Sequence, residues 1–377
     1  MSTAIINPSI LYWSRQRAGL TEDTLAHSLS VKPEKVYEWE SGETAPTFRQ
    51  AQKWAATAHI PFGFLFLKEP PHEELPLPDL RTVGGVGPEK PSLNLVDSVK
   101  DVLRKQHWYL DYLSEQGAPP LPFVGKFTIR YPVKDVVADM RMTLGITGEV
   151  VRGSHDDYLR ALISSSEVAG ILVMRSGIVA GNTHRKLDVG EFRGFAISHE
   201  MAPMVFINSA DAPTARIFTL VHELAHIWIG TSGVSSGNVE AGRQEEAFCN
   251  AVAGEFLVPE SAFRAIWREM DEWVMQLGEL ASHFKMSRLV VARRACDLGF
   301  ISQQDYREFY LAELEAFRNK EKSGGSYYTN ASAKNSHRLS KAVLAETLSG
   351  NMLLRDAAKL LGIQPSKIKT YAGSLSE

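Results

Sequence analysis

The stretch Val221-His222-Glu223-Leu224-Ala225-His226 sets the interpretation of this chain. It is an H-E-x-x-H motif inside a segment with the periodicity of a helix. Histidines four residues apart on a helix project from one face, so His222 and His226 can reach the same metal ion. A glutamate beside the first histidine can polarise a water molecule bound to that metal. The motif therefore predicts a metal site with Glu223 as its catalytic base.

An apolar stripe on the same helix predicts which side of it faces the core. The stripe consists of Ile217, Val221, Leu224 and Trp228. Both histidines lie on a different side of the helix from this stripe. Asp211 and Pro213 stand in the usual cap and first-turn positions, and Gly230 follows the helix. The alternative interpretation is a pair of core histidines with satisfied hydrogen bonds and no metal.

Two histidines fill only half of a tetrahedral zinc shell, so a third protein ligand is needed. A helix is expected from Gln244 to Pro259, after a Gly/Ser-rich loop at 230–242. Glu246 on this helix can complete a His-His-Glu site, and Glu245 is the competing ligand. Asn250 shares the face of Glu246 and can hold one histidine by a hydrogen bond, which favours Glu246.

Two further features of this second helix leave its interpretation open. Ala253 and Gly254, one turn beyond Asn250, would permit another helix to approach closely. Without the preceding motif, Glu246 and Asn250 would simply be an ordinary solvated helix face.

Residues 125–300 resemble the ImmA/IrrE-type zinc metallopeptidases of bacteria and their mobile elements. The matching residues are Phe192-Arg193-Gly194, Ala202-Pro203, Phe206-Ile207-Asn208, Phe218-Thr219-Leu220, His222 to His226, and Glu246 through Asn250 to Leu257-Val258-Pro259. The resemblance implies a reduced, thermolysin-like zincin fold with Zn²⁺ on His222, His226 and Glu246. It also implies that Glu223 is the general base.

The resemblance further implies that the strand ending at Phe206, Ile207 and Asn208 borders the cleft and pairs with an extended substrate. The sequence departs from many relatives at Asn250, usually aspartate, and at Phe248, often glutamate. A weaker acceptor at Asn250 could lower zinc affinity or activity. His199 is a candidate oxyanion stabiliser, or else an exposed turn residue.

The fold class expected from these patterns is α+β, mostly α. Helices are predicted at 133–144 and 155–168, ahead of the zinc helix. Short β-rich runs at 170–174, 194–199 and 203–208 predict a small, mostly antiparallel sheet.

Residues 1–68 are expected to form five short helices, including a helix that ends near Leu29, a tight turn, and a helix that starts at Lys32. They resemble XRE-type helix-turn-helix domains. The matching residues are Leu20-Thr21, Leu25-Ala26, Val31, Val36, Trp39-Glu40, Gly42 and Ala45-Pro46. The resemblance implies a DNA-recognition segment from Lys32 to Glu38, with Lys32, Lys35 and Tyr37 as candidate contacts.

This N-terminal domain departs from the XRE pattern in charge. Glu22 replaces the usual glutamine, and six basic residues in 1–60 face six acidic ones. Because phosphate contacts supply most DNA affinity, a neutral module should bind DNA weakly or only as a dimer. The alternative is a helical domain that makes protein–protein contacts.

The remaining segments flank the zinc domain. Residues 69–124 are expected to be a proline-rich linker followed by a packing helix at 95–116. Residues 277–300 again have helix-turn-helix spacing. This segment could be a helical cap packed on the zinc domain, or it could contact DNA phosphates through Arg288, Arg293 and Arg294. Residues 301–325 are expected to be a helix and a hinge at Ser323-Gly324-Gly325.

A small helical module is expected at 326–377, with helices at 339–348, 354–361 and 365–371. Seven basic residues against three acidic ones in 334–377 give it a net charge of +4. This makes it a better electrostatic candidate for nucleic acid than the N-terminal domain, although it could equally dock a partner protein.

Composition narrows the class of protein. The net charge of −3 provides no global attraction to nucleic acid, and only two cysteines are present, as expected for a reducing cytoplasm. The sequence begins without the pattern of a signal peptide, and its apolar runs are too short for a membrane span.

The expected function is a cytoplasmic, regulatory zinc metallo-endopeptidase fused to a DNA-binding domain, which cleaves a specific protein such as a repressor. The alternative is an antitoxin or transcriptional repressor that acts by binding, with little peptidase turnover. A general degradative protease would not need the flanking domains. The expected partners are a protein substrate or toxin, DNA bound weakly and, as an alternative to a monomer, a second copy of the chain. No membrane partner is expected.

Overall fold

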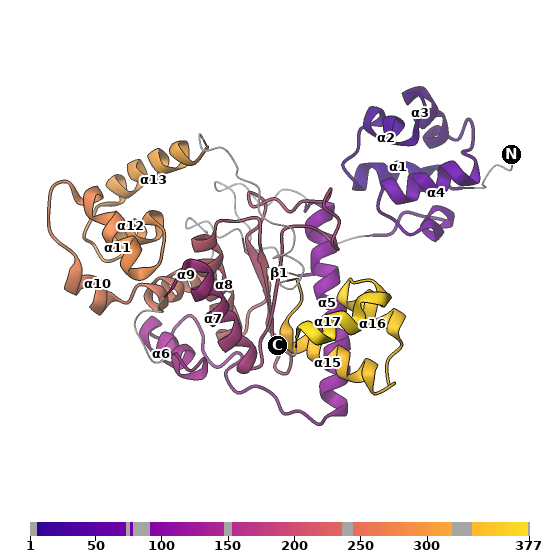
Figure 1. Cartoon of the computed structure of the whole chain (residues 1–377). Helices are drawn as coiled ribbons and strands as arrows, with labels where there is room; N and C mark the ends of the chain where they lie inside the picture. Colours follow the sequence, from indigo (N-terminus) through magenta and orange to yellow (C-terminus); the bar gives the residue numbers. More distant parts are fainter. Residues whose placement is uncertain are drawn as a thin grey trace. The chain divides into compact units, whose positions relative to one another are not determined.

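A computed structural model describes residues 6–72, 76–77, 91–146, 153–235, 244–318 and 334–375 (Figure 1). The chain divides into two compact units. The first holds Met1–Pro76 and Lys90–Asp97, and the second holds Leu77–Glu89 and Ser98–Glu377. The predicted hinge at 323–325 lies outside the described residues. Within them, no helix combines the length and the apolarity that crossing a bilayer requires.

The first unit is helical, as predicted. Its elements are α1 (Pro8–Arg17), α2 (Glu22–Leu29), α3 (Pro33–Ser41), α4 (Phe48–Thr57) and the 3-10 helix η1 (Phe62–Phe66). The side chain of Thr21 caps α2, and Gly42, with φ of 81°, ends α3. Trp39 and Trp54 pack edge to face in the core, with their ring centroids 6.1 Å apart. The fifth predicted helix is thus a short 3-10 turn rather than an α-helix.

The second unit is built around a four-stranded sheet. Its strands are β1 (Leu172–Ser176), β2 (Gly194–Ile197), β3 (Met204–Asn208) and β4 (Gly233–Ser235), in the order β1-β3-β2-β4. The β3–β2 and β2–β4 pairs are antiparallel, and the β1–β3 pair is parallel. The sheet is therefore mixed, with mostly antiparallel pairing. β4 was not predicted, because its residues lie in the segment expected to be a loop.

Helices cover both faces of this sheet (Figure 1). One face packs on α8 (Pro213–Trp228), and around it lie α6 (Val133–Thr143), α7 (His155–Val168) and α9 (Gln244–Leu257). The other face lies against α5 (Leu93–Glu115), where Gln106 donates a hydrogen bond of 2.7 Å to the carbonyl oxygen of Ala202. The predicted packing helix therefore covers the second face of the sheet.

The motif helix α8 lies between the sheet and α9, so it is buried on all sides from Thr219 to Trp228. The predicted apolar stripe faces the core, but His222 and His226 are buried as well. The predicted cap was wrong, because Ala212 is the N-cap residue. Asp211 instead accepts a hydrogen bond from the Ala212 amide and pairs with Arg193 at 3.4 Å.

Between α9 and residue 318 the described chain forms α10 (Glu260–Ile266), η2 (Trp273–Gln276), α11 (Leu277–Phe284), α12 (Arg288–Asp297) and α13 (Gln303–Arg318). The apolar side chains of α11 and α12 join the main core, as expected for a helical cap. Arg294 is buried, donates to the carbonyl oxygen of Val258 and pairs with Glu255, so it cannot contact phosphate.

The C-terminal module contains α15 (His337–Leu348), α16 (Leu354–Leu361), η3 (Pro365–Lys367) and α17 (Ile368–Ser374), close to the predicted bounds. Arg338 joins it to α5 through a hydrogen bond of 2.8 Å to the Tyr109 hydroxyl. It also donates to the carbonyl oxygen of Glu167.

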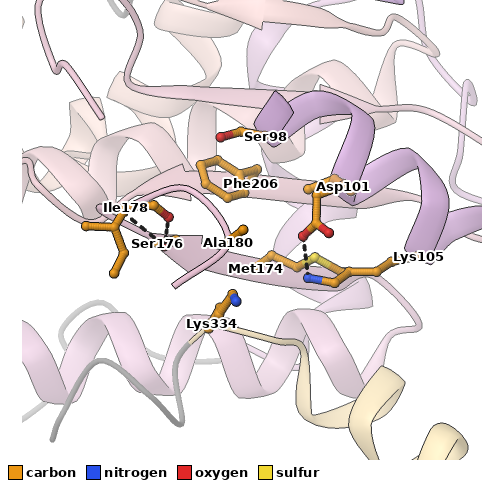
Figure 2. Close-up of a pocket in the computed structure, with 10 residues that line it drawn as sticks. Ser98, Asp101, Lys105, Met174, Ser176, Ile178, Ala180, Phe206 and Lys334 are labelled. Atoms are coloured by element: carbon orange, nitrogen blue, oxygen red, sulfur yellow. Dashed lines mark hydrogen bonds and ion pairs between the residues drawn. The ribbon is translucent and has the colours of Figure 1, made fainter. Parts of the chain in front are cut away.

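A small cavity lies between α5, the sheet and the start of this module (Figure 2). It measures about 20 Å³, room for roughly one water molecule. Lys105, paired with Asp101 at 2.7 Å, and Lys334 line it. Burial and the nearby charge of Lys105 lower the pKa of Lys334. Met174 and Phe206, which also line the cavity, alternate with the residues that face α8, so the cavity lies across the sheet from the motif histidines.

Candidate metal centre

The two histidines of α8 and a glutamate of α9 converge on one point. The Nε2 atoms of His222 and His226 are 3.2 Å apart. Glu246 approaches His222 with one carboxylate oxygen at 3.3 Å and His226 with the other at 3.0 Å. These three residues form the group among the described residues that could hold a metal ion. Glu245, the competing ligand, is part of no such group.

This donor set fits a zinc ion. Bonds of about 2.0–2.1 Å in tetrahedral geometry place neighbouring ligand atoms about 3.3 Å apart, close to the distances of this cluster. Two imidazole nitrogens and one carboxylate are also the donor types that catalytic zinc sites use, with the fourth position left open. The residues present could therefore hold Zn²⁺.

Electrostatics keeps the glutamate charged. Burial alone would raise the pKa of Glu246, but hydrogen bonds and charge from the two imidazoles lower it well below its ordinary range. Burial also opposes protonation of the histidines. In His222 the neighbouring Glu246 outweighs burial and the pKa is raised, whereas in His226 burial prevails and the pKa is lowered. An ionised carboxylate and an imidazole that resists protonation are suitable metal ligands.

Thr231 orients the second histidine. Its hydroxyl oxygen lies 2.8 Å from Nδ1 of His226, on the side of the ring away from the cluster. A hydrogen bond at Nδ1 leaves Nε2 free to coordinate metal, which is the usual arrangement around metal-bound histidines. Thr231 was not predicted from the sequence, because it lies beyond the helix in a loop without fixed spacing.

Asn250 lies close to His222, as predicted from its position on α9. However, its buried amide atoms and Nδ1 of His222 form no hydrogen bond of normal geometry among the described residues. Asn250 nevertheless lies within hydrogen-bonding reach of the His222 ring and favours its protonated form, so the predicted hydrogen bond stays a prediction.

Glu223 is fully buried and lies against β2. A Cβ atom added to Gly194 would come within 2.9 Å of Oε1 of Glu223. Because glycine has no side chain, this position leaves space for the carboxylate of Glu223. Gly194 also pairs with Ser235, so the edge strand β4 passes close to the same point.

The predicted pairing of Phe206, Ile207 and Asn208 with a substrate strand was wrong, because β3 lies inside the sheet. β1 and β2 occupy both of its edges, so it cannot pair with a substrate strand. Phe206 stacks on Phe195 at 4.9 Å, and Ile207 belongs to the core. Asn208 donates to the carbonyl oxygen of Phe192 and accepts from the amide of Ala210.

Two other polar residues have structural roles. His199 lies in the turn after β2, where its Nδ1 accepts a hydrogen bond from the amide of Met201. Its part in stabilising an oxyanion stays a prediction. Burial raises the pKa of the Cys249 thiol well above its ordinary value, so this neutral side chain packs in the core.

The candidate DNA contacts of the first unit lie on α3 and its cap. Lys32 is the N-cap residue, and Tyr37 is 57% exposed. Lys35 forms an ion pair of 2.5 Å with Glu38, which also accepts a hydrogen bond from Thr44. The charge of Lys35 is thereby largely neutralised.

Comparisons with known proteins are consistent with a metal site formed by α8 and α9. Residues 335–374 match the family model of a domain of unknown function (DUF8813). No curated protein and no solved structure matches the chain. Residues 166–295, about a third of the chain, match the family model described as IrrE N-terminal-like domain (Peptidase_M78). This segment, which contains β1 to β4 and all three candidate ligands, is therefore similar to the IrrE N-terminal-like domain of metallopeptidases.

Proposed function

We propose that this protein is a regulatory zinc-dependent metallo-endopeptidase that cleaves a specific protein, such as a repressor. One observation carries the proposal: His222, His226 and Glu246 meet within 3.3 Å of one another, next to a buried glutamate at position 223. A purely structural metal site has no need of that glutamate. The match to a metallopeptidase family supports the same reading.

The residues of the site would divide the work of peptide hydrolysis. Bound zinc would supply Lewis acidity that polarises a carbonyl group and lowers the pKa of water. Glu223 would accept the proton of the attacking water and later pass it to the leaving amine. Thr231 would hold the His226 ring, and Gly194 would leave the Glu223 carboxylate free to move between these two proton partners.

The edge strand β4 is the best place for an extended substrate. Among the described strands it has a neighbour on one side only, β2, so its other edge can pair with a peptide by strand addition. Ser235 lies opposite Gly194, which contacts Glu223, so a peptide on this edge would pass near the base. β4 thus takes the role that the sequence assigned to β3.

We further propose that residues 1–68 are an XRE-type DNA-binding module that acts in the cytoplasm, and that it contributes to DNA recognition weakly or as a homodimer. The turn between α2 and α3 supports this assignment, and the ion pair of Lys35 with Glu38 accounts for the weakness. The test compares the sequences that the whole chain and a chain lacking residues 1–68 select from randomised duplexes. Identical selected sequences would contradict the assignment.

A second candidate function is an antitoxin or transcriptional repressor that acts by binding a toxin or DNA with little turnover. The burial of the centre favours it, because Glu223 and the three candidate ligands are each at most 2% exposed. A metal enclosed in this way can serve as a structural or sensory site.

Substitution of Glu223 by glutamine separates the two functions. The wild type, Glu223→Gln and the control Glu245→Gln would be purified for metal analysis and expressed with the tagged products of the adjacent genes. We expect equal zinc in all three proteins and cleavage of one product by wild type and control, reduced about 10²- to 10⁴-fold in Glu223→Gln. Full activity of Glu223→Gln with zinc retained would reject the peptidase and favour the binding function.

A further inference from the structure

The same helix-turn-helix geometry occurs three times in the part of the chain that the structure describes. We call the segments 22–41, 277–297 and 354–374 helix-turn-helix A, B and C. In each, a first helix of eight residues ends at a residue with a left-handed backbone: Ser30 (φ 59°), Lys285 (φ 56°) and Gly362 (φ 64°). The second helical segment begins three residues later in all three.

The packing of the three segments also agrees position by position. The fourth, fifth and eighth residues of the first helix are buried, and the fifth is alanine each time: Ala26, Ala281 and Ala358. The carbonyl oxygen of this alanine accepts a hydrogen bond of 3.0 Å from the second residue of the turn, which is Val31, Met286 or Ile363. A small residue here lets the second helix cross the first, as in helix-turn-helix proteins that read DNA.

Segments A and B are poorly suited to DNA. On A, Glu34 and Glu38 share the second helix with a single lysine, Lys35, which is paired with Glu38. On B, α13 packs against the second helix. Arg288 pairs with Glu313 of α13 at 2.8 Å, and Arg293 pairs with Asp297 at 2.8 Å.

Segment C differs from both in charge and exposure. No acidic residue occurs between Ala357 and Leu375. Lys359, Lys367 and Lys369 are exposed and have no ion-pair partner among the residues that the structure describes. The module from 335 to 374 holds six basic and two acidic residues, a net charge of +4 in a chain of −3, so the remainder carries −7. A basic patch on an acidic protein is a local attraction for a polyanion.

The structure also holds segment C in place while leaving its second helix open. The Tyr371 hydroxyl lies 3.0 Å from the hydroxyl of Ser340 on α15, which ties α17 to the module. Arg338, on α15, anchors the module to α5. Gln364, Ser366 and Thr370 remain exposed beside the lysines, and side chains of these types can hydrogen-bond to base edges.

We propose that helix-turn-helix C binds double-stranded DNA, with Pro365–Ser374 as its recognition segment. Lys359, Lys367 and Lys369 contact phosphates, which supply most of the affinity. This function goes beyond the peptidase and beyond the DNA-binding role proposed for residues 1–68. It assigns a ligand to a domain whose family description gives none.

The test measures binding of the whole chain to a fluorescent duplex of random sequence, roughly 30 base pairs or three helical turns long, at several salt concentrations. The variant Lys367→Ala/Lys369→Ala is compared with the matched control Lys32→Ala/Lys35→Ala in segment A. We measure the slope of the logarithm of the DNA-binding constant against the logarithm of the salt concentration. The magnitude of this slope should fall by about 2 in the segment C variant and by less than about 1 in the control. Thermal unfolding and zinc content should match the wild type in both, because these lysines are on the surface.

Three outcomes would overturn the proposal. The first is a wild-type chain that binds no duplex in a salt-dependent manner. The second is loss of binding in the segment A control with retention in the segment C variant. The third is unchanged duplex binding in the segment C variant together with loss of a protein partner, a role that the exposed Leu348, Leu353 and Leu354 would favour. None of these outcomes depends on peptidase activity.

Discussion

Replacement of Gly194 by alanine tests how tightly β2 packs on the motif helix. The added Cβ would lie 2.6 Å from Cγ2 of Thr219, 2.9 Å from Oε1 of Glu223 and 2.9 Å from the carbonyl oxygen of Phe206. Ordinary carbon contacts are about 3.5–4.0 Å, so each neighbour would have to move by roughly half an ångström or more. The carbonyl belongs to the backbone of β3, which the sheet holds in place. Overpacking of this kind costs about 1–3 kcal/mol.

Thermal unfolding of the metal-loaded protein measures this cost. We expect Gly194→Ala to lower Tm by about 2–12 °C, given roughly 2–4 °C per kcal/mol for a domain of this size. Zinc content should stay normal, while any peptidase activity should fall about 100-fold because the general base is displaced.

The matched control is Gly254→Ala in α9. Its added Cβ would meet only Nη1 of Arg294, at 4.0 Å, so an alanine side chain fits at this position. Alanine there should raise stability by about 0.5–1 kcal/mol through helix propensity. A Gly194→Ala protein that melts at or above the wild-type temperature would refute the packing argument.

Three further substitutions probe the centre and its support. Glu246→Ala should abolish stoichiometric zinc binding while Glu245→Ala retains it, and metal analysis showing the reverse would reassign the third ligand. Thr231→Val removes the hydrogen-bond partner of the second motif histidine at nearly constant volume, and should weaken zinc binding about 10- to 100-fold in a competition titration with a chelator. Trp228→Phe removes the 2.8 Å hydrogen bond to Asp139 and should cost about 1–3 kcal/mol in denaturant unfolding without loss of zinc; unchanged stability would show that this bond contributes little.

Local sequence patterns predicted the elements well because helices leave short-range signals. The spacing of His222 and His226 placed both histidines on one helical face, and Asn250, one turn beyond Glu246 on the same face, favoured Glu246 over Glu245. The structure brings these three residues together. The bounds of α7, α8 and α16 also lie within one or two residues of those predicted.

The strand order was beyond the reach of local patterns. Phe206-Ile207-Asn208 reads as a strand in either an edge or an interior position, since alternation and β-propensity are the same in both. Only pairing with β1 and β2 makes β3 an interior strand. The short β4 was missed because Gly233–Ser235 carries no strand pattern of its own and is ordered by its pairing with β2.

The sequence by itself determined the ligand types, their helical spacing and the charge of each segment, because these depend on residues close together in the chain. Tertiary structure decided which of these features can act. It buried His222 and His226 between the sheet and α9, placed Thr231 behind one ring, and set Gly194 against Glu223. It also covered helix-turn-helix B with α13 and left C exposed, although all three segments share one local pattern. Exposure and long-range contact depend on how distant segments pack, which no window of neighbouring residues records.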